Sequence, residues 1–432
     1  MDEAIPLDRV TAGTATVVLL GTLDTKGEEY TYLARQVRAA GCDVILIDAG
    51  SLGPPLAEPT IGRDEVARAA TADAVALAMA GDRGAAIAAM ARGAAVVVGR
   101  LYAEGRLHGI LGLGGSGGTA LVTEAMRALP IGVPKLMVST VASGDTRPYV
   151  GATDITMMFS VVDIAGINRF SARILSNAAA AIAGMAQGYA VAATTVESEA
   201  DAKPLIGATM FGVTTDCVTT ARRLLEERGY EVLVFHAVGT GGQALEALIA
   251  GGFLAGVLDA TTTELADELV GGVFSAGPTR LTAASKAALP QVVSLGALDM
   301  VNFGPRDTVP PQFRDRNLHV HNASVTLMRT TPGECAELGR RVAARLRGAA
   351  GSPTGPLAVF VPLRGVSAIA TEGGVFYDPE ADRALFAALR EGLGDGVEVH
   401  ELDLAINDPA FATAMAERLL ALIAERGDVR VG

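Results

Sequence analysis

The sequence predicts an α/β protein of two domains, each with a mainly parallel sheet, and a cleft between the domains. Three observations predict this class. Apolar β-rich runs alternate with helical stretches, glycines follow many of these elements, and the same order of elements occurs in both halves. The 432 residues suffice for two or three domains, and half of them are hydrophobic, which supplies a large core.

The first half begins with a strand–helix–strand unit. Residues 16–20 are β-rich, a helical stretch at 28–40 ends at Gly41, and residues 43–48 are the next expected strand. Such a unit implies that its two strands are parallel. Further strands are expected at 110–113 and 133–140. The segments 50–62 and 143–146 are expected to be loops, and two Ala-rich helices should precede residue 110.

The second half repeats this order. Residues 205–211 predict a strand, 214–228 a helix that Gly229 ends, and 232–235 the next strand, before a glycine turn at 239–242. Duplication of one domain explains the repeat, although strand–helix–strand units also resemble one another without it. The expected domains are residues 1–200 and 204–432, joined by a polar segment at 197–203.

Composition excludes several classes of function. The net charge of −13 opposes nucleic-acid binding. No apolar run reaches the roughly 18 residues of a membrane span, and the first 16 residues lack the basic region of a secretory signal. Cys42, Cys217 and Cys335 have no metal-type spacing, which suits a reducing compartment. We therefore expect a cytoplasmic protein without a membrane or nucleic-acid partner.

The run at 111–119 is the strongest candidate for a binding site. It has five glycines within seven residues, after an apolar stretch and before a helical pattern. A helix that starts at such a turn offers backbone N–H groups and its dipole to an anion, and glycine permits close approach and positive φ. A tight turn without a ligand is the alternative. The run has neither P-loop nor dinucleotide spacing, so it does not name the ligand. Its candidate residues are Gly114, Gly115, Ser116, Gly117, Gly118 and Thr119.

Two more strand ends carry small polar loops, and ligands of open α/β sheets bind at the carboxyl ends of strands. The first loop offers Lys26 to a phosphate and Asp24 to Mg²⁺, although Asp24 and Thr25 suit helix capping equally. Asp48 ends a strand and suits either a ribose or a turn cap. In the other loop, Asp145 is the second candidate metal ligand, with a satisfied turn as its alternative. The full set in these segments is Gly21, Thr22, Asp24, Thr25, Lys26, Asp48, Ser143, Gly144 and Asp145.

The second half offers groups for chemistry on another substrate. His236 ends a strand beside a glycine turn, although a lone histidine is often structural. His319 and His321 are expected on one face of a strand. The acidic residues 264, 267 and 268 suit a metal, a base or a solvated helix face. Arginines suit a carboxylate or phosphate. The candidate catalytic residues are His236, Arg306, His321, Arg329 and Arg364.

Long motifs in both halves resemble the Tm-1-like (UPF0261) family. They include GTLDTK at 21–26, GGSGGTA at 114–120, PIGVPKLMVST at 130–140, LDMVNFGP at 298–305 and PLRGVS at 362–367. The resemblance covers essentially the whole chain. It implies two Rossmann-like domains, ATP binding in the N-terminal domain and a tendency to form homodimers.

Together these observations predict a protein that uses ATP and Mg²⁺ on a small acidic metabolite, as a kinase or an ATP-dependent ligase. Phosphoryl transfer requires bound phosphates, a cation and placed charges rather than a covalent nucleophile. The alternative is a non-catalytic ATP-binding module that regulates the protein or binds a partner.

Overall fold

The computed structural model describes residues 14–71, 82–194, 203–348, 351 and 353–429. The chain forms two units, Met1–Ala200 and Asp201–Gly432. Each is described by itself, so the cleft expected between the domains stays a prediction. The predicted linker at 197–203 lies outside the described residues except for Lys203.

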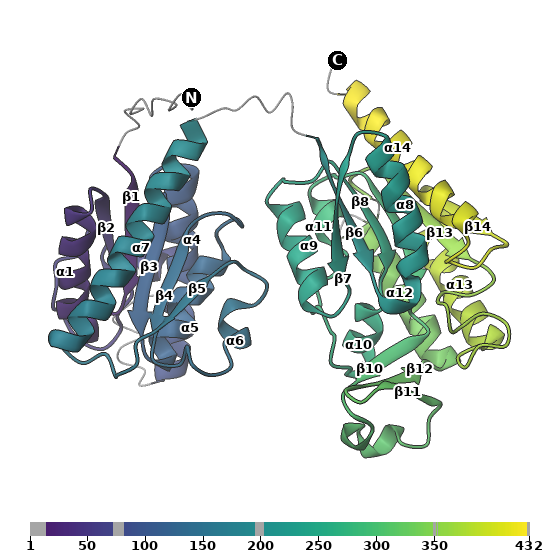
Figure 1. Cartoon of the computed structure of the whole chain (residues 1–432), viewed down its shortest axis with the longest axis horizontal. Helices are drawn as coiled ribbons and strands as arrows, with labels where there is room; N and C mark the ends of the chain where they lie inside the picture. Colours follow the sequence, from purple (N-terminus) through teal and green to yellow (C-terminus); the bar gives the residue numbers. More distant parts are fainter. Residues whose placement is uncertain (1–13, 72–81, 195–202, 349–350, 352, 430–432) are drawn as a thin grey trace, which may run out of the picture. The chain divides into compact units, whose positions relative to one another are not determined.

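The N-terminal unit is a five-stranded parallel sheet in the order β2-β1-β3-β4-β5 (Figure 1). Its strands are β1 (Thr16–Gly21), β2 (Asp43–Asp48), β3 (Gly109–Gly114), β4 (Lys135–Ser139) and β5 (Thr156–Phe159). Its described helices are α1 (Leu23–Ala39), α2 (Arg63–Ala69), α4 (Arg83–Ala103), α5 (Ser116–Arg127), α6 (Arg147–Val150) and α7 (Arg169–Thr194). β1 lies between β2 and β3, so the winding of the chain reverses there.

Alternate residues of the strands enter two separate cores, one on each face of this sheet. Val17 and Leu19 of β1 pack with α1 and α7, whereas Val18 and Leu20 pack with α2, α4 and α5. Burial on both faces explains why the strands read as continuous apolar runs. The helices and parallel strands confirm the predicted α/β class.

Two of these helices, α4 and α7, are long and apolar enough to cross a membrane by length and composition. This differs from the expectation that no segment reaches that length. Both helices place buried side chains in the cores beside the sheet, such as Val98 of α4 and Ile182 of α7. Packing inside an α/β unit accounts for their apolar composition, and nothing indicates membrane insertion.

The C-terminal unit has a six-stranded parallel sheet, β14-β13-β9-β8-β6-β7, and an antiparallel sheet, β10-β12-β11 (Figure 1). The strands are β6 (Leu205–Met210), β7 (Glu231–His236), β8 (Gly256–Thr261), β9 (Gln291–Gly296), β10 (Met300–Phe303), β11 (Leu318–Asn322), β12 (Val325–Arg329), β13 (Leu357–Pro362) and β14 (Glu398–Leu402). The described α-helices are α8 (Thr215–Glu227), α9 (Thr240–Ala250), α10 (Glu264–Val270), α11 (Ala283–Lys286), α12 (Pro332–Arg347), α13 (Pro379–Leu393) and α14 (Pro409–Val429). The 3₁₀ turns are η1 (Gly212–Thr214), η2 (Arg306–Thr308), η3 (Pro311–Phe313) and η4 (Gly394–Gly396).

Both parallel sheets follow one winding order. If the parallel strands of each unit are counted from its first strand, the order is 2-1-3-4-5 in both, with a sixth strand added in the C-terminal unit. This is the order expected if the halves are related. It is also a common order of doubly wound folds. In both units the winding reverses between the first and third strands, where such folds bind ligands.

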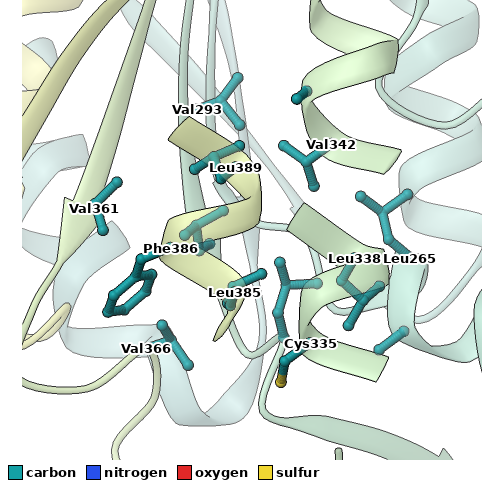
Figure 2. Close-up of a cluster of buried hydrophobic side chains, with 14 of the residues drawn as sticks. Leu265, Val293, Cys335, Leu338, Val342, Val361, Val366, Leu385, Phe386 and Leu389 are labelled. Carbon is teal, nitrogen blue, oxygen red and sulfur yellow. The ribbon is translucent and has the colours of Figure 1, made fainter. Parts of the chain in front are cut away.

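The largest apolar cluster of the C-terminal unit lies between its sheet, α12 and α13. Figure 2 shows Leu385 of α13 facing the α12 side chains, while Phe386 lies beside Val366. All of these side chains are at most 4% exposed. Burying one such leucine or phenylalanine contributes about 1.5–3 kcal/mol, so this contact holds α12 and α13 on the sheet.

A buried arginine, Arg280, links several elements at the centre of the same unit. The guanidinium of Arg280 is fully buried and pairs with both oxygens of Asp259 at 2.6 Å and with Glu264 at 2.7 Å. The other oxygen of Glu264 accepts the N–H groups of Gly239 and Gly242 at 2.7 and 3.0 Å. The network therefore ties strand β8 to the start of both α9 and α10.

Replacing Arg280 with methionine should lower the free energy of unfolding of this unit by about 3–5 kcal/mol, because two buried carboxylates lose their counter-charge. Denaturant unfolding followed by circular dichroism measures this loss of unfolding free energy. The matched control is Arg222→Met, which removes an exposed ion pair with Glu226 and should cost about 0.3–0.5 kcal/mol. Equal losses in the two variants would contradict a central role for the network.

A second buried carboxyl makes stability depend on pH. Burial raises the pKa of Asp267 from 3.8 to about 7, against the opposing effect of hydrogen bonds from Asn302 and the Phe274 N–H. The folded chain therefore keeps this proton between about pH 4 and 7, while the unfolded chain releases it. Stability should fall as pH rises through that window, by up to about 1.4 kcal/mol per pH unit.

The variant Asp267→Asn should remove this part of the slope between pH 4 and 7. Asn302 Oδ1 is buried without a partner, so a rotated Asn302 amide can accept from the new side chain. Burial also raises the pKa of Asp299, to about 6, and this contribution should remain in the variant. Unfolding measured at four pH values in both proteins tests the difference, and parallel curves would show that Asp267 ionises normally.

Candidate functional site

A small cavity lies at the carboxyl ends of β1 and β3, where the winding of the N-terminal sheet reverses. Its volume is about 60 Å³. Residues from the start of α1, the loop after β2, and the starts of α4 and α5 line it: Thr22, Asp24, Thr25, Ser51, Leu52, Arg83, Ile87, Gly117 and Gly118. Ligands of doubly wound sheets bind at this position.

The glycine run forms the start of α5, with Gly115 as the residue before the helix. None of its glycines has positive φ, so that expectation was wrong. Gly114 is needed for packing, because a Cβ there would lie 3.0 Å from the Cα of Gly118. A Cβ at Gly115 or Gly118 would meet nothing nearer than 3.5 Å, and at Gly117 only the flexible tip of Ile87 at 3.2 Å. Internal packing therefore explains Gly114 but leaves open space beside the other three.

The two hydroxyl groups predicted for this helix start differ. Ser116 is exposed at the first position of α5. Thr119 is fully buried, and its hydroxyl hydrogen-bonds the Gly115 carbonyl and the Ser139 hydroxyl at 2.8 and 2.7 Å. Thr119 therefore ties α5 to β4 and does not face a ligand, which corrects its predicted role.

At the end of β1, the helix starts at Leu23, five residues earlier than predicted. Asp48 explains this, because its Oδ1 accepts the Leu23 N–H at 3.0 Å and the Gly50 N–H at 2.8 Å. Its Oδ2 pairs with Arg63 at 3.1 Å. Asp48 is fully buried, so it caps a helix and a turn and has no free oxygen for a ribose.

Asp24 does not cap its own helix. Its Oδ2 accepts the N–H groups of Leu52 and Gly53 at 2.7 and 3.4 Å, which holds the loop after β2. Its Oδ1 is buried without a hydrogen-bond partner. The hydroxyls of Thr22 and Thr25 lie 2.9 Å apart beside it. Asp24 therefore shapes the cavity and has one buried oxygen without a hydrogen-bond partner.

Gly21 and Lys26 have other contacts. A Cβ at Gly21 would lie 2.1 Å from the hydroxyl of Tyr30, so this glycine makes room for a buried tyrosine. The Lys26 ammonium donates to the Ile164 carbonyl after β5 and does not line the cavity. The cation that does line it is Arg83 at the start of α4, which sequence analysis missed. No local pattern marks Arg83, because its position depends on how α4 packs against α5.

The loop after β4 is separate from the cavity. Ser143, Gly144 and Asp145 are exposed, and none of them lines it. Both oxygens of Asp145 are bound to the Arg147 guanidinium at 2.9 and 2.8 Å. These bonds lower the pKa of Asp145 to about 2. The structure does not bring Asp145 to Asp24, and the described residues contain no cluster of three potential metal ligands.

The five catalytic candidates of the C-terminal unit do not converge. Arg329 is buried, donates to the Phe376 carbonyl at 2.8 Å and pairs with Asp382 at 2.7 Å. Arg306 is exposed and donates to the Arg314 carbonyl at 3.2 Å. Arg364 is exposed and pairs with Asp403 at 2.7 Å, beside a separate cavity of about 790 Å³. Only His236 and His321 share a cavity, one of about 240 Å³.

The acidic residues after β8 have internal roles. Glu264 binds Arg280 and the start of α9, and Asp267 binds Asn302. Glu268 accepts a hydrogen bond from Ser275. These contacts explain the three residues without a metal or a base.

Family models match both halves of the chain, and related proteins match most of its length. The N-terminal domain model of the uncharacterised protein family UPF0261 matches residues 15–191, and the C-terminal domain model matches 203–423. A UPF0261 protein of Clostridium tetani is 52% identical over 94% of this chain and 98% of its own length. The ToMV resistance protein Tm-1(GCR237) of Solanum lycopersicum is 41% identical over 94% of this chain but 55% of its own length.

Solved structures resemble the chain only weakly. UDP-N-acetylglucosamine 2-epimerase from Rickettsia bellii is 10% identical, covers 65% of this chain and 78% of its own, and has a TM-score of 0.22. MurG of Acinetobacter baumannii is 11% identical, with coverage of 96% and 98% and the same TM-score. Neither likeness carries an argument about function. The two family models and the bacterial relative show that the chain belongs to the UPF0261 family, and the tomato protein Tm-1 is similar to it over part of its own length.

Proposed function

We propose that the N-terminal unit binds the phosphates of ATP in the cavity between β1 and β3, in a cytoplasmic protein. One observation carries the proposal. The open glycine positions of α5, the Arg83 side chain and the Thr22 and Thr25 hydroxyls line one cavity. Backbone N–H, guanidinium and hydroxyl groups are all able to donate hydrogen bonds to an anion, and these come from separate segments of the chain.

Physical chemistry favours a phosphate at this point. The first N–H groups of α5 have no partner inside the helix, and the helix dipole adds partial positive charge. Arg83 adds a full charge and can bind phosphate oxygens with two N–H groups. At about 60 Å³ the cavity is far below the size of a whole-ligand pocket. It suits one phosphoryl group, with the nucleoside lying outside.

Asp24 is the residue we propose for Mg²⁺. Its Oδ1 is a buried oxygen without a partner, and Asp24 is among the residues that line the same cavity. A single protein carboxylate suits Mg²⁺, which takes its remaining ligands from phosphates and water. When bound, the ion would neutralise charge on the phosphate oxygens. Asp145 is not part of this proposal because Arg147 occupies both of its oxygens.

Whether ATP is consumed is the second part of the proposal. A kinase or ligase would act on a small acidic metabolite, yet Arg329 and Arg364 are already paired with internal carboxylates. This observation favours the alternative, an ATP-binding module that acts through a homodimer or another partner. The printed name of the tomato relative, a ToMV resistance protein, also suits a binding role.

The variants Arg83→Ala and Gly117→Val should weaken ATP binding, measured by calorimetry with Mg²⁺. Loss of one charge-assisted contact of about 1.5–3 kcal/mol raises the dissociation constant roughly 10- to 150-fold, and a valine would fill the phosphate position. The controls are Arg92→Ala on the same helix and Gly184→Val in α7, where a Cβ has open space. ATP affinity retained in both test variants would reject the site.

Release of ADP or AMP, screened against small acidic metabolites, separates the enzyme from the module. If the protein is an enzyme, one metabolite should stimulate release at least tenfold, and His321→Ala should abolish release while ATP binding survives. His400→Ala serves as the control, because His400 stacks on Phe360 and does not line the shared histidine cavity. Tight ATP binding without stimulated release would support the module.

A further inference from the structure

A second cavity lies at the carboxyl ends of β6 and β7 in the C-terminal unit. It has a volume of about 240 Å³. The end of β6, the end of β7 and the β11–β12 hairpin line it together with Phe274, so it joins the parallel sheet to the small antiparallel one. His236 comes from β7 and His321 from β11, 85 positions apart in sequence.

The backbone fixes both histidines. At β7, Gly241 lets α9 approach the strand end, since a Cβ there would lie 1.9 Å from the His236 carbonyl oxygen. At β11, the pairing register shifts between Val320 and Asn322, which leaves His321 as the extra residue of a bulge. Bulges redirect side chains and are frequent beside active sites. His319 instead packs edge-on against Phe376, with ring centres 6.3 Å apart.

The cavity is lined by both aromatic rings and polar side-chain groups. Phe211 stands edge-on to both His236 and Phe274, with ring centres 5.5 and 6.3 Å apart. The Asn322 Oδ1 accepts the Ser324 N–H at 2.8 Å, so its NH₂ group is the part left to donate. No ring nitrogen of either histidine has a hydrogen-bond partner within the described chain, and each ring offers a donor and an acceptor.

The lack of charged side chains in this cavity determines which ligands it can bind. No Asp, Glu, Lys or Arg is among the residues that line this cavity. A cation would therefore find no counter-charge, whereas an oxygen acceptor would find imidazole and carboxamide N–H groups. The volume is below that of a drug-sized pocket and far above that of a single phosphate.

We propose that this cavity binds a small, non-cationic organic molecule that carries a carbonyl or carboxylate head on an aromatic or aliphatic body. His236, His321 and the Asn322 NH₂ group bind the head, and Phe211, Phe274 and Leu327 contact the body. All residues of this site belong to the C-terminal unit and those of the proposed nucleotide site to the N-terminal unit, so binding at each can be tested separately.

The test uses three probes of one shape, benzamide (neutral), benzoate (anionic) and benzamidine (cationic), titrated into the full chain with ¹³C-labelled histidine. The chain has five histidines, which substitutions assign in NMR spectra. Benzamide and benzoate should shift the His236 and His321 signals with about millimolar affinity. Benzamidine should bind at least tenfold more weakly. No shift of these two signals, or equal binding of benzamidine, would overturn the proposal.

Variants locate the binding. His236→Gln and His321→Gln should each weaken benzamide binding about 3- to 10-fold, and the control His400→Gln should leave it unchanged, because His400 stacks on Phe360 elsewhere. Val238→Phe keeps both histidines but fills the cavity, so it should abolish the shifts. Unchanged binding in Val238→Phe would overturn the assignment. Arg83→Ala should bind benzamide normally, which separates this result from that of the nucleotide site.

Discussion

Parallel pairing of strands is the constraint on which the rest of this structure depends. Because every strand of each large sheet runs in one direction, all carboxyl ends lie at one edge of that sheet. The winding reverses at β1 in one unit and at β6 in the other, which separates the loops that follow neighbouring strands. The glycine helix start with Arg83 and the histidine cavity lie at these two edges. The order of the strands sets the place of both sites, and the bulge at His321 then adjusts the histidine cavity locally.

The two glycine turns show how differently the same sequence pattern can be used. At residues 239–242, the N–H groups of Gly239 and Gly242 already bind the internal carboxylate of Glu264. At 115–118, none of the side chains that the structure describes occupies the equivalent space, and a Cβ would meet little. A helix start attracts an anion in either case. In one unit the chain itself supplies the anion, and in the other the position is open to a ligand.

The arginines and histidines also fall into two groups, those bound inside the fold and those open to solvent. Arg280 and Arg329 are buried and bound to carboxylates, so they hold the fold together. Arg83 and the two cavity histidines are exposed and lack such partners in the described chain. Burial of an arginine requires pairing, because an unpaired charge in the interior is costly. Arg329, a catalytic candidate from the sequence, is therefore a poor candidate for ligand binding, and Arg83, which the sequence analysis missed, is better placed.

The sequence by itself determined the α/β class, the six strands for which it gave bounds to within two residues, and the glycine helix start, because these depend on local periodicity and turn chemistry. It also identified His236 and His321 singly. Only the tertiary structure decided that these two share a cavity, that Asp48 caps a helix 25 positions away, and that Lys26 turns to the Ile164 carbonyl. Such contacts join residues far apart in sequence. They are set by strand order and helix packing, which local patterns do not encode.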